Sequence, residues 1–219
     1  MPKSKKSRAK PGFAFDPIAA VAHLRASDPV LAAIIERHGP FALQLRTVKT
    51  IFEALLRSII YQQLHGAAAE AIHGRVIAAL RKQGPIAPET LARMSDEPLR
   101  AAGLSAGKLR ALRDLAEKCL AGVVPTMAEA RRLDETELLA RLTAVRGVGP
   151  WTVHMLMIFY LGHADVLPTG DLAIRAAFRR LYRKRKEPTP AHILRHARRW
   201  SPYRSVASWY LWRSLETKL

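Results

Sequence analysis

Cysteine is almost missing from this sequence, since the 219-residue chain contains only Cys119. A single thiol cannot form a disulfide within the chain and cannot build a zinc site from cysteine ligands. Long hydrophobic runs are missing as well, so no segment is predicted to cross a membrane. The N-terminus also lacks the apolar stretch of a secretory signal. We therefore expect an intracellular protein that does not span a membrane.

Acidic residues are half as numerous as basic ones. The chain has 36 Lys and Arg against 18 Asp and Glu, which gives a formal net charge of +18 and a pI of about 10.9. Such an excess favours a polyanionic partner, either a nucleic acid or an acidic membrane surface. The excess is concentrated in residues 171–219, which contain thirteen basic and three acidic residues. We expect this segment to dominate the electrostatic attraction to the partner.

Residues 1–15 contain five basic residues and no acidic residue. Their Lys, Ser and Pro content predicts a disordered basic tail. Such a tail serves either as a nuclear targeting signal or as a nonspecific tether to a polyanion, and the sequence leaves both open.

Strand signals are scarce, and the Ala, Leu, Arg and Glu content with its 3.6-residue periodicity predicts an all-α protein. Asp16-Pro17 and Asp28-Pro29 each suit an N-cap followed by proline at the first helical position. The predicted helices cover approximately residues 17–26, 29–38, 47–63, 66–82, 88–94, 96–101, 105–121, 133–144, 151–160, 171–183, 190–200 and 203–215.

A glycine-rich turn separates the helices predicted at 133–144 and 151–160, and it has the sequence V-R-G-V-G-P-W. Gly147 and Gly149 can adopt positive φ at little cost, and Pro150 suits the first position of the next helix. Backbone N–H groups of such a turn, together with the helix dipole, can bind a phosphate. Glycine spacing alone leaves an ordinary connection between two helices as the alternative.

The segment V-R-G-V-G-P-W-T is followed about twenty residues later by L-P-T-G-D-L-A-I, and this pair resembles the helix-hairpin-helix (HhH-GPD) DNA glycosylases. The greatest similarity is to the 3-methyladenine DNA glycosylase II branch. The segments R-S-I-I-Y-Q-Q-L at 57–64, G-L-S-A-G-K at 103–108 and W-S-P-Y-R-S at 200–205 extend the resemblance. It covers the chain from about Phe15 to the C-terminus.

The resemblance implies a two-lobed helical bundle with an active-site cleft between the lobes. Residues 49–164 are expected to form a central lobe that ends in the helix-hairpin-helix motif, and residues 16–48 to pack with 165–219. Only about fifteen residues precede the first predicted helix, which implies the short form without an N-terminal β-rich domain. The single cysteine excludes the four-cysteine iron–sulfur cluster that many relatives of endonuclease III carry.

Asp171 precedes a predicted helix and suits its N-cap, whereas the resemblance implies that it is the catalytic carboxylate. The two roles are compatible because a helix N-terminus favours a negative charge. An anion near the sugar stabilises the oxocarbenium character that develops as the base departs. An alkylated purine is already cationic and leaves without a strong general acid, so one carboxylate suits such a base.

The resemblance implies that Trp151, Met155 and Trp212 line the base pocket, where an indole face can bind a cationic base. Core packing is the alternative for each of them. Met155 stands where a related architecture has tyrosine. Trp151 also stands where endonuclease III-like enzymes have a lysine that attacks the sugar. The resemblance therefore implies hydrolysis by water, without cleavage of the DNA strand.

The resemblance also assigns the DNA contacts. The hairpin residues that would bind a DNA phosphate are Arg146, Gly147, Val148 and Gly149. The turn Gln62-Gln63-Leu64 would face the minor groove, with Gln63 or Leu64 filling the gap left by the flipped base. The alternative places Leu64 in the core and both glutamines on the surface. His65 stands where relatives often have serine.

No cofactor is expected. His192 and His196 are four residues apart but lack a third ligand in a recognised pattern, so no metal bound by side chains is predicted. The resemblance implies a monovalent cation held by the backbone carbonyls of Thr143, Val145 and Val148, which would bridge the hairpin to a DNA phosphate.

The sequence therefore predicts a monofunctional glycosylase that hydrolyses the N-glycosidic bond of 3-methyladenine and 7-methylpurines in base excision repair. We expect a monomer that acts on double-stranded DNA containing damaged bases, in the bacterial nucleoid or the eukaryotic nucleus. The alternative is a non-catalytic helix-hairpin-helix DNA-binding protein. The range of lesions stays open and could include 7-methylguanine, hypoxanthine, 1-methyladenine and 3-methylcytosine.

Overall fold

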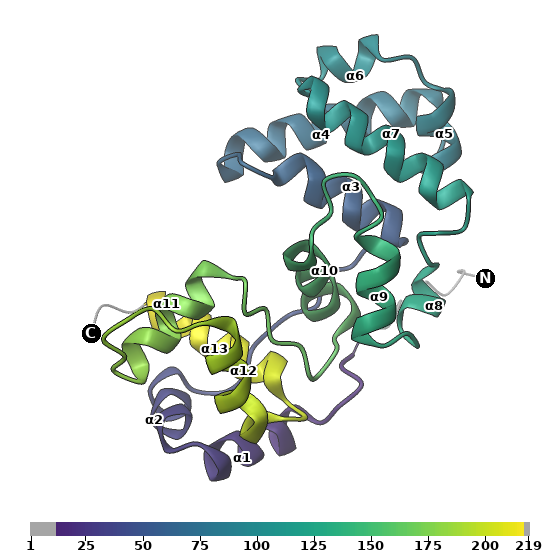
Figure 1. Ribbon diagram of the computed structural model, residues 1–219. Helices are drawn as coiled ribbons and strands as arrows, with labels where there is room; N and C mark the ends of the chain where they lie inside the picture. Colours follow the sequence, from purple (N-terminus) through teal and green to yellow (C-terminus); the bar gives the residue numbers. More distant parts are fainter. Residues whose placement is uncertain (1–11, 217–219) are drawn as a thin grey trace, which may run out of the picture. The chain divides into compact units, whose positions relative to one another are not determined.

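The computed structural model describes residues 12–216, and all regular secondary structure in that range is helical (Figure 1). The predicted all-α class is therefore confirmed. Residues 1–11 of the predicted basic tail lie outside the described residues. Among residues 12–216, no helix is long and apolar enough to cross a membrane.

The chain divides into two compact units. The central unit is Val48–Leu156, and the terminal unit combines the chain up to Thr47 with the chain from Met157 onward. The division at Leu156 differs from the boundary predicted at residue 164. Residues 157–161 belong with the terminal unit because Phe159 contacts two of its residues. The Phe159 carbonyl accepts the Arg46 N–H at 2.8 Å, and the Phe159 ring stacks on Trp212.

The central unit is built around α3, whose apolar face is buried against α7 and α4. Leu55, Ile59 and Ile60 of α3 are fully buried, as their helical spacing predicts. The helices of this unit are α3 (Ile51–Tyr61), α4 (Gly66–Gln83), α5 (Pro88–Arg93), α6 (Glu97–Ala101), α7 (Ala106–Leu120), α8 (Met127–Ala130), α9 (Glu135–Leu142) and α10 (Pro150–Leu156).

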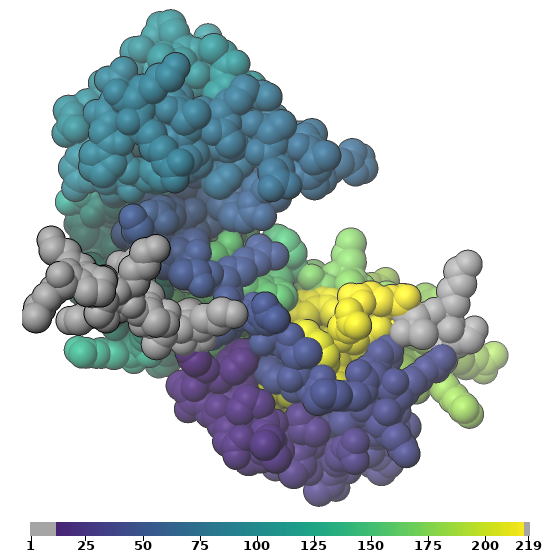
Figure 2. Space-filling model, turned by 180° about the vertical axis from the view of Figure 1, so that it is seen from behind, coloured from purple at the N-terminus to yellow at the C-terminus, as the bar shows by residue number. Residues whose placement is uncertain are grey.

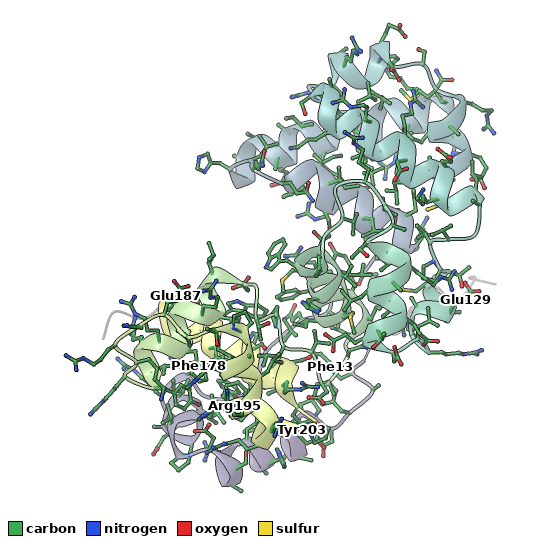
Figure 3. The ribbon with its side chains drawn as sticks, viewed as in Figure 1. Phe13, Glu129, Phe178, Glu187, Arg195 and Tyr203 are labelled. Carbon is green, nitrogen blue, oxygen red and sulfur yellow. The ribbon has the colours of Figure 1, made fainter. Side chains whose placement is uncertain are left out.

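The terminal unit is built around α13, which packs against α11, α2 and α1. Its helices are α1 (Pro17–Ser27), α2 (Pro29–His38), the π-helix η1 (Met157–Leu161), α11 (Leu172–Leu181), α12 (Pro190–His196), the 3-10 helix η2 (Ala197–Trp200) and α13 (Arg204–Glu216). Its core contains three fully buried aromatic side chains among aliphatic ones, namely Phe178 (labelled in Figure 3), Trp200 and Tyr210. The segment after α2 lies beside α13 (Figure 2), where Phe41 meets Trp209 edge to face.

A buried carboxylate joins four elements of the terminal unit. Asp28 caps α2 through Oδ1, while its Oδ2 accepts bonds from Tyr182 Oη and Trp200 Nε1, both at 2.8 Å, and lies 3.0 Å from His196 Nε2. Burial acts to raise the pKa of Asp28, but the hydrogen bonds from Trp200, Tyr182 and His196 outweigh it and lower the pKa. His196 is thus engaged with Asp28, and the described residues contain no group of three potential metal-binding side chains.

Most predicted helices are present, and the differences have local causes. The four-residue α8 was not predicted, although Thr126 and Glu129 form a capping box that marks its start. The next helix begins at Glu135 because Asp134 caps it in a second such box, with Glu137. The helix predicted to continue to Tyr160 instead becomes π-helical from Met157 onward.

Candidate nucleic-acid interface and catalytic carboxylate

The hairpin between α9 and α10 reverses the chain through one left-handed residue, Gly147, with φ +79°. This φ would strain any side chain at position 147. Crowding would add nothing, because an added Cβ would lie at an ordinary contact distance of 3.6 Å from Ala111 Cβ. Gly149 does not adopt positive φ, and a Cβ at that position would meet nothing within 4 Å. The expectation that both glycines use their conformational freedom is therefore wrong for Gly149.

Two hydrogen bonds from distant segments fix the hairpin. The Arg146 N–H donates to Asp114 Oδ2 of α7 at 2.7 Å, and Gln62 Nε2 donates to the Gly147 carbonyl at 2.7 Å. Val145 and Val148 are buried on the inner side, so the backbone between them is held from several directions. Asp114 was missed from the sequence because a carboxylate 32 residues away on another helix carries no local signal.

The turn after α3 has an unusual backbone. Gln63 adopts φ +58°, a conformation that costs a residue other than glycine free energy and often occurs at functional sites. Leu64 is 36% exposed, so the alternative that places it in the core is wrong. Lys108 Nζ donates to the Ile60 carbonyl at 2.6 Å and holds the end of α3. The minor-groove contacts of this turn stay a prediction, and the amide of Gln62 is already bonded to the hairpin.

The predicted cation site consists of backbone carbonyls at the C-terminal end of α9. Thr143 is the C-cap of that helix, and the Val145 carbonyl accepts the Val148 N–H at 3.0 Å. A carbonyl oxygen has two lone pairs, so Val145 can still contribute to a cation. The negative end of the α9 dipole also favours a positive charge here. Thr143, Val145 and Val148 are therefore chemically suited to the expected ion, whose binding stays a prediction.

Asp171 is the N-cap of α11, as the sequence predicts. Its Oδ1 accepts the Ile174 N–H at 2.9 Å and the indole N–H of Trp212 at 3.2 Å. The carboxylate that caps α11 is thus also in contact with Trp212, which is one of the predicted base-pocket residues. The contact joins two residues 41 positions apart.

The other pocket candidates lie on α10 of the central unit. Trp151 is 49% exposed although Val153 and Leu156 of the same helix are buried, so core packing is wrong for this side chain. Met155 is half-buried. His154 packs within the central unit, where its Nε2 lies 2.9 Å from Glu135 Oε1. The structure therefore joins Asp171 to Trp212 in one unit and Gln62 to Gly147 in the other.

The chain matches the family model described as HhH-GPD superfamily base excision DNA repair protein over residues 56–202. That range is more than half of the chain and includes the hairpin and Asp171, so the chain belongs to this family. The predicted family is thereby confirmed.

Individual relatives agree. The chain is 42% identical over 166 residues to DNA-3-methyladenine glycosylase 1 of Schizosaccharomyces pombe. The aligned region covers 76% of this chain and 73% of that protein. The solved structure of the S. pombe 3-methyladenine DNA glycosylase in complex with abasic DNA matches with a TM-score of 0.78 and 38% identity, covering 91% of this chain and 97% of that one. A DNA-3-methyladenine glycosidase from Bacillus halodurans matches with a TM-score of 0.82 and 35% identity, over 90% of this chain and 89% of that one.

Proposed function

We propose that this chain is a DNA glycosylase that excises alkylated purines by hydrolysing the N-glycosidic bond. The observation that carries the proposal is the Asp171 carboxylate, held at the N-terminus of α11 and bonded to the Trp212 indole. The names of the S. pombe and B. halodurans relatives support 3-methyladenine as the first base to test.

Asp171 supplies the negative charge that the reaction needs. As the bond to the base stretches, positive charge develops on the deoxyribose, and a fixed carboxylate lowers the free energy of that state. The carboxylate also orients the attacking water. A base alkylated at N3 or N7 carries its own positive charge, so it departs without a strong acid beside it. A site that relies on one carboxylate therefore favours excision of such cationic bases over normal bases, which need an acid in order to depart.

The aromatic side chains supply base recognition. A flipped cationic base stacks on an indole face, which attracts it through the ring quadrupole as well as by contact. Trp212 takes this role together with its bond to Asp171. Trp151 and Met155 of the central unit are further candidates for contact with the base. Trp151 is exposed and therefore accessible to a base.

The reaction stops at an abasic site. An indole cannot form a Schiff base with the sugar, and Trp151 stands at the hairpin position where bifunctional relatives have the attacking lysine. The product is free base together with an intact strand that alkali cleaves.

The hairpin binds the DNA backbone. Its N–H groups and the start of α10 bind a phosphate regardless of sequence. A monovalent cation held by the backbone carbonyls of Thr143, Val145 and Val148 would add positive charge for that phosphate. The partner is thus duplex DNA with a damaged base, approached by a monomer whose charge of +18 strengthens the encounter.

The direct test incubates the purified protein with duplexes that each contain one modified base and measures release of the free base. We expect release of 3-methyladenine and 7-methylguanine, and strand cleavage only after alkali. A protein that binds every duplex and releases no base would instead be the non-catalytic DNA-binding protein. The same panel, extended to hypoxanthine, 1-methyladenine and 3-methylcytosine, defines the range of substrates.

A further inference from the structure

The π-helical turn η1 lies within the terminal unit, and π-turns are rare features that often occur at functional sites. Four of its five residues, Met157, Ile158, Tyr160 and Leu161, are buried, whereas Phe159 is half-buried. The turn is followed by Gly162, which has φ +73°, and an added Cβ there would lie 2.9 Å from Leu45 Cδ1. The backbone of the turn is therefore closely determined, and so is the direction of Phe159.

Phe159 stacks on Trp212, with 5.6 Å between the ring centroids and 27° between the ring planes. The indole has a single N–H, and that group donates to Asp171 Oδ1 at 3.2 Å. The three side chains come from η1, α13 and the N-cap of α11. Because an indole is rigid, a ring packed against its face limits the directions in which its N–H can point.

Arg46 holds Phe159 in turn. Its backbone N–H donates to the Phe159 carbonyl at 2.8 Å, and its guanidinium carbon lies 5.5 Å from the Phe159 ring centroid. The same guanidinium lies 5.8 Å from the ring of Tyr160. An arginine at this distance is attracted to an aromatic face. Phe159 is thus fixed at its backbone and at its ring.

We propose that Phe159 is a positioning residue, which holds the Trp212 indole and, through its N–H, the Asp171 carboxylate in the orientation that base excision requires. The inference rests on the proposed function. Without the stacked ring, the indole can move between rotamers and withdraw its hydrogen bond from Oδ1 of Asp171. Small displacements of a catalytic group are costly, because the reaction depends on the placement of its charge.

The test compares single-turnover excision of 3-methyladenine by the full-length protein and its variants, together with binding to duplex containing an abasic-site analogue. We expect Phe159→Leu to lower the excision rate about tenfold at unchanged binding, and Phe159→Tyr to restore it. Phe159→Met, which fills similar space without a ring, gives the same comparison if the leucine variant is not folded at the assay temperature.

Phe41→Leu is the matched control. Phe41 is also half-buried and packs edge to face on Trp209 of the same helix α13, with 5.1 Å between ring centroids. The substitution removes the contacts of the Phe41 ring with Trp209 and Tyr210 of α13, and neither of these is part of the Trp212–Asp171 pair. We expect a lower melting temperature and an unchanged excision rate. If Phe159→Leu behaves like this control, Phe159 only fills space and the inference is wrong.

A double-mutant cycle tests whether Phe159 acts on the excision rate through the Trp212 N–H. Trp212→Phe keeps a ring in the stack but has no N–H, so adding Phe159→Leu to it should lower the rate no further. Losses that simply multiply would overturn the inference, since Phe159 would then act independently of that N–H. A wild-type protein that releases no base would overturn the proposed function itself, a result distinct from normal excision by Phe159→Leu.

Discussion

Asp171 receives two hydrogen bonds on the same oxygen, one from the backbone that it caps and one from Trp212. Capping alone needs only an acceptor, and asparagine supplies one. Stabilising positive charge on a sugar needs a full negative charge. The two roles can therefore be separated by a substitution that keeps the acceptor and removes the charge.

We expect Asp171→Asn to keep the fold, with at most a small loss of stability, and to lower the single-turnover excision rate by about 10²–10³. Binding to duplex with an abasic-site analogue should be retained or become tighter, because a carboxylate near phosphates is repelled by them. Asp171→Ala is the control for capping, since it also removes the acceptor and should lower the melting temperature. Excision by a folded Asp171→Asn protein at the parent rate would show that Asp171 is only a cap.

Trp151 gives a second prediction for a single residue. With tryptophan in place of the attacking lysine, borohydride should trap no covalent complex between the protein and DNA, and strands should stay intact until alkali is added. Gel electrophoresis of the reaction with and without borohydride measures both. Efficient trapping would mean that another amine attacks the sugar, which is incompatible with water as the nucleophile.

At the scale of elements, the two glycines of the hairpin differ in backbone conformation. Gly147 has φ +79°, whereas Gly149 has an ordinary φ and open space around it. We expect Gly147→Ala to cost about 1–2 kcal/mol and to weaken binding to damaged and undamaged duplex alike, because a phosphate contact does not depend on sequence. Gly149→Ala should leave the melting temperature unchanged. A loss of binding by Gly147→Ala for one lesion only would place the hairpin in the base pocket instead.

Asp28 links α2, α11, α12 and η2 of the terminal unit, and its pKa is lowered below the ordinary value of 3.8. A lowered pKa in the folded state stabilises the fold above the ordinary pKa, and this contribution is lost as the pH falls through the folded pKa. We expect Asp28→Asn to be less stable at neutral pH by about 1–3 kcal/mol, since it weakens bonds to a buried charge. Urea unfolding at several pH values should show that the difference in free energy of unfolding between the parent protein and Asp28→Asn becomes smaller in acid. A difference that does not depend on pH would mean that the charge contributes nothing.

At the scale of the whole molecule, the charge predicts how binding depends on salt. Residues 171–219 contribute +10 and residues 1–15 contribute +5 to the formal net charge of +18. We expect affinity for undamaged duplex to fall steeply as salt rises, through release of counterions. Deleting residues 1–11 should make that dependence less steep, with excision in low salt retained. Loss of excision in low salt would mean that these residues do more than attract DNA.

The helices and their caps were predictable because their causes are local. Asp16, Asp28 and Asp171 each cap the helix that follows, through bonds to backbone groups two or three residues away. The burial of Leu55, Ile59 and Ile60 follows from their spacing on one helix face. The capping box that begins α8 is equally local, and reading Thr126 with Glu129 would have found that helix.

The sequence by itself determined the all-α class, the family, the hairpin and the helix that Asp171 caps, because these depend on periodicity and on contacts within a few residues. Only the tertiary structure decided which side chains hold those parts in place. Gln62 bonds to a carbonyl 85 positions away, and Trp212 to a carboxylate 41 positions away. Phe159 stacks on Trp212 from a turn that becomes π-helical after Leu156, a change that the helical periodicity did not predict. Packing between distant segments selects such partners, and the choice of a distant partner leaves no pattern in the local sequence.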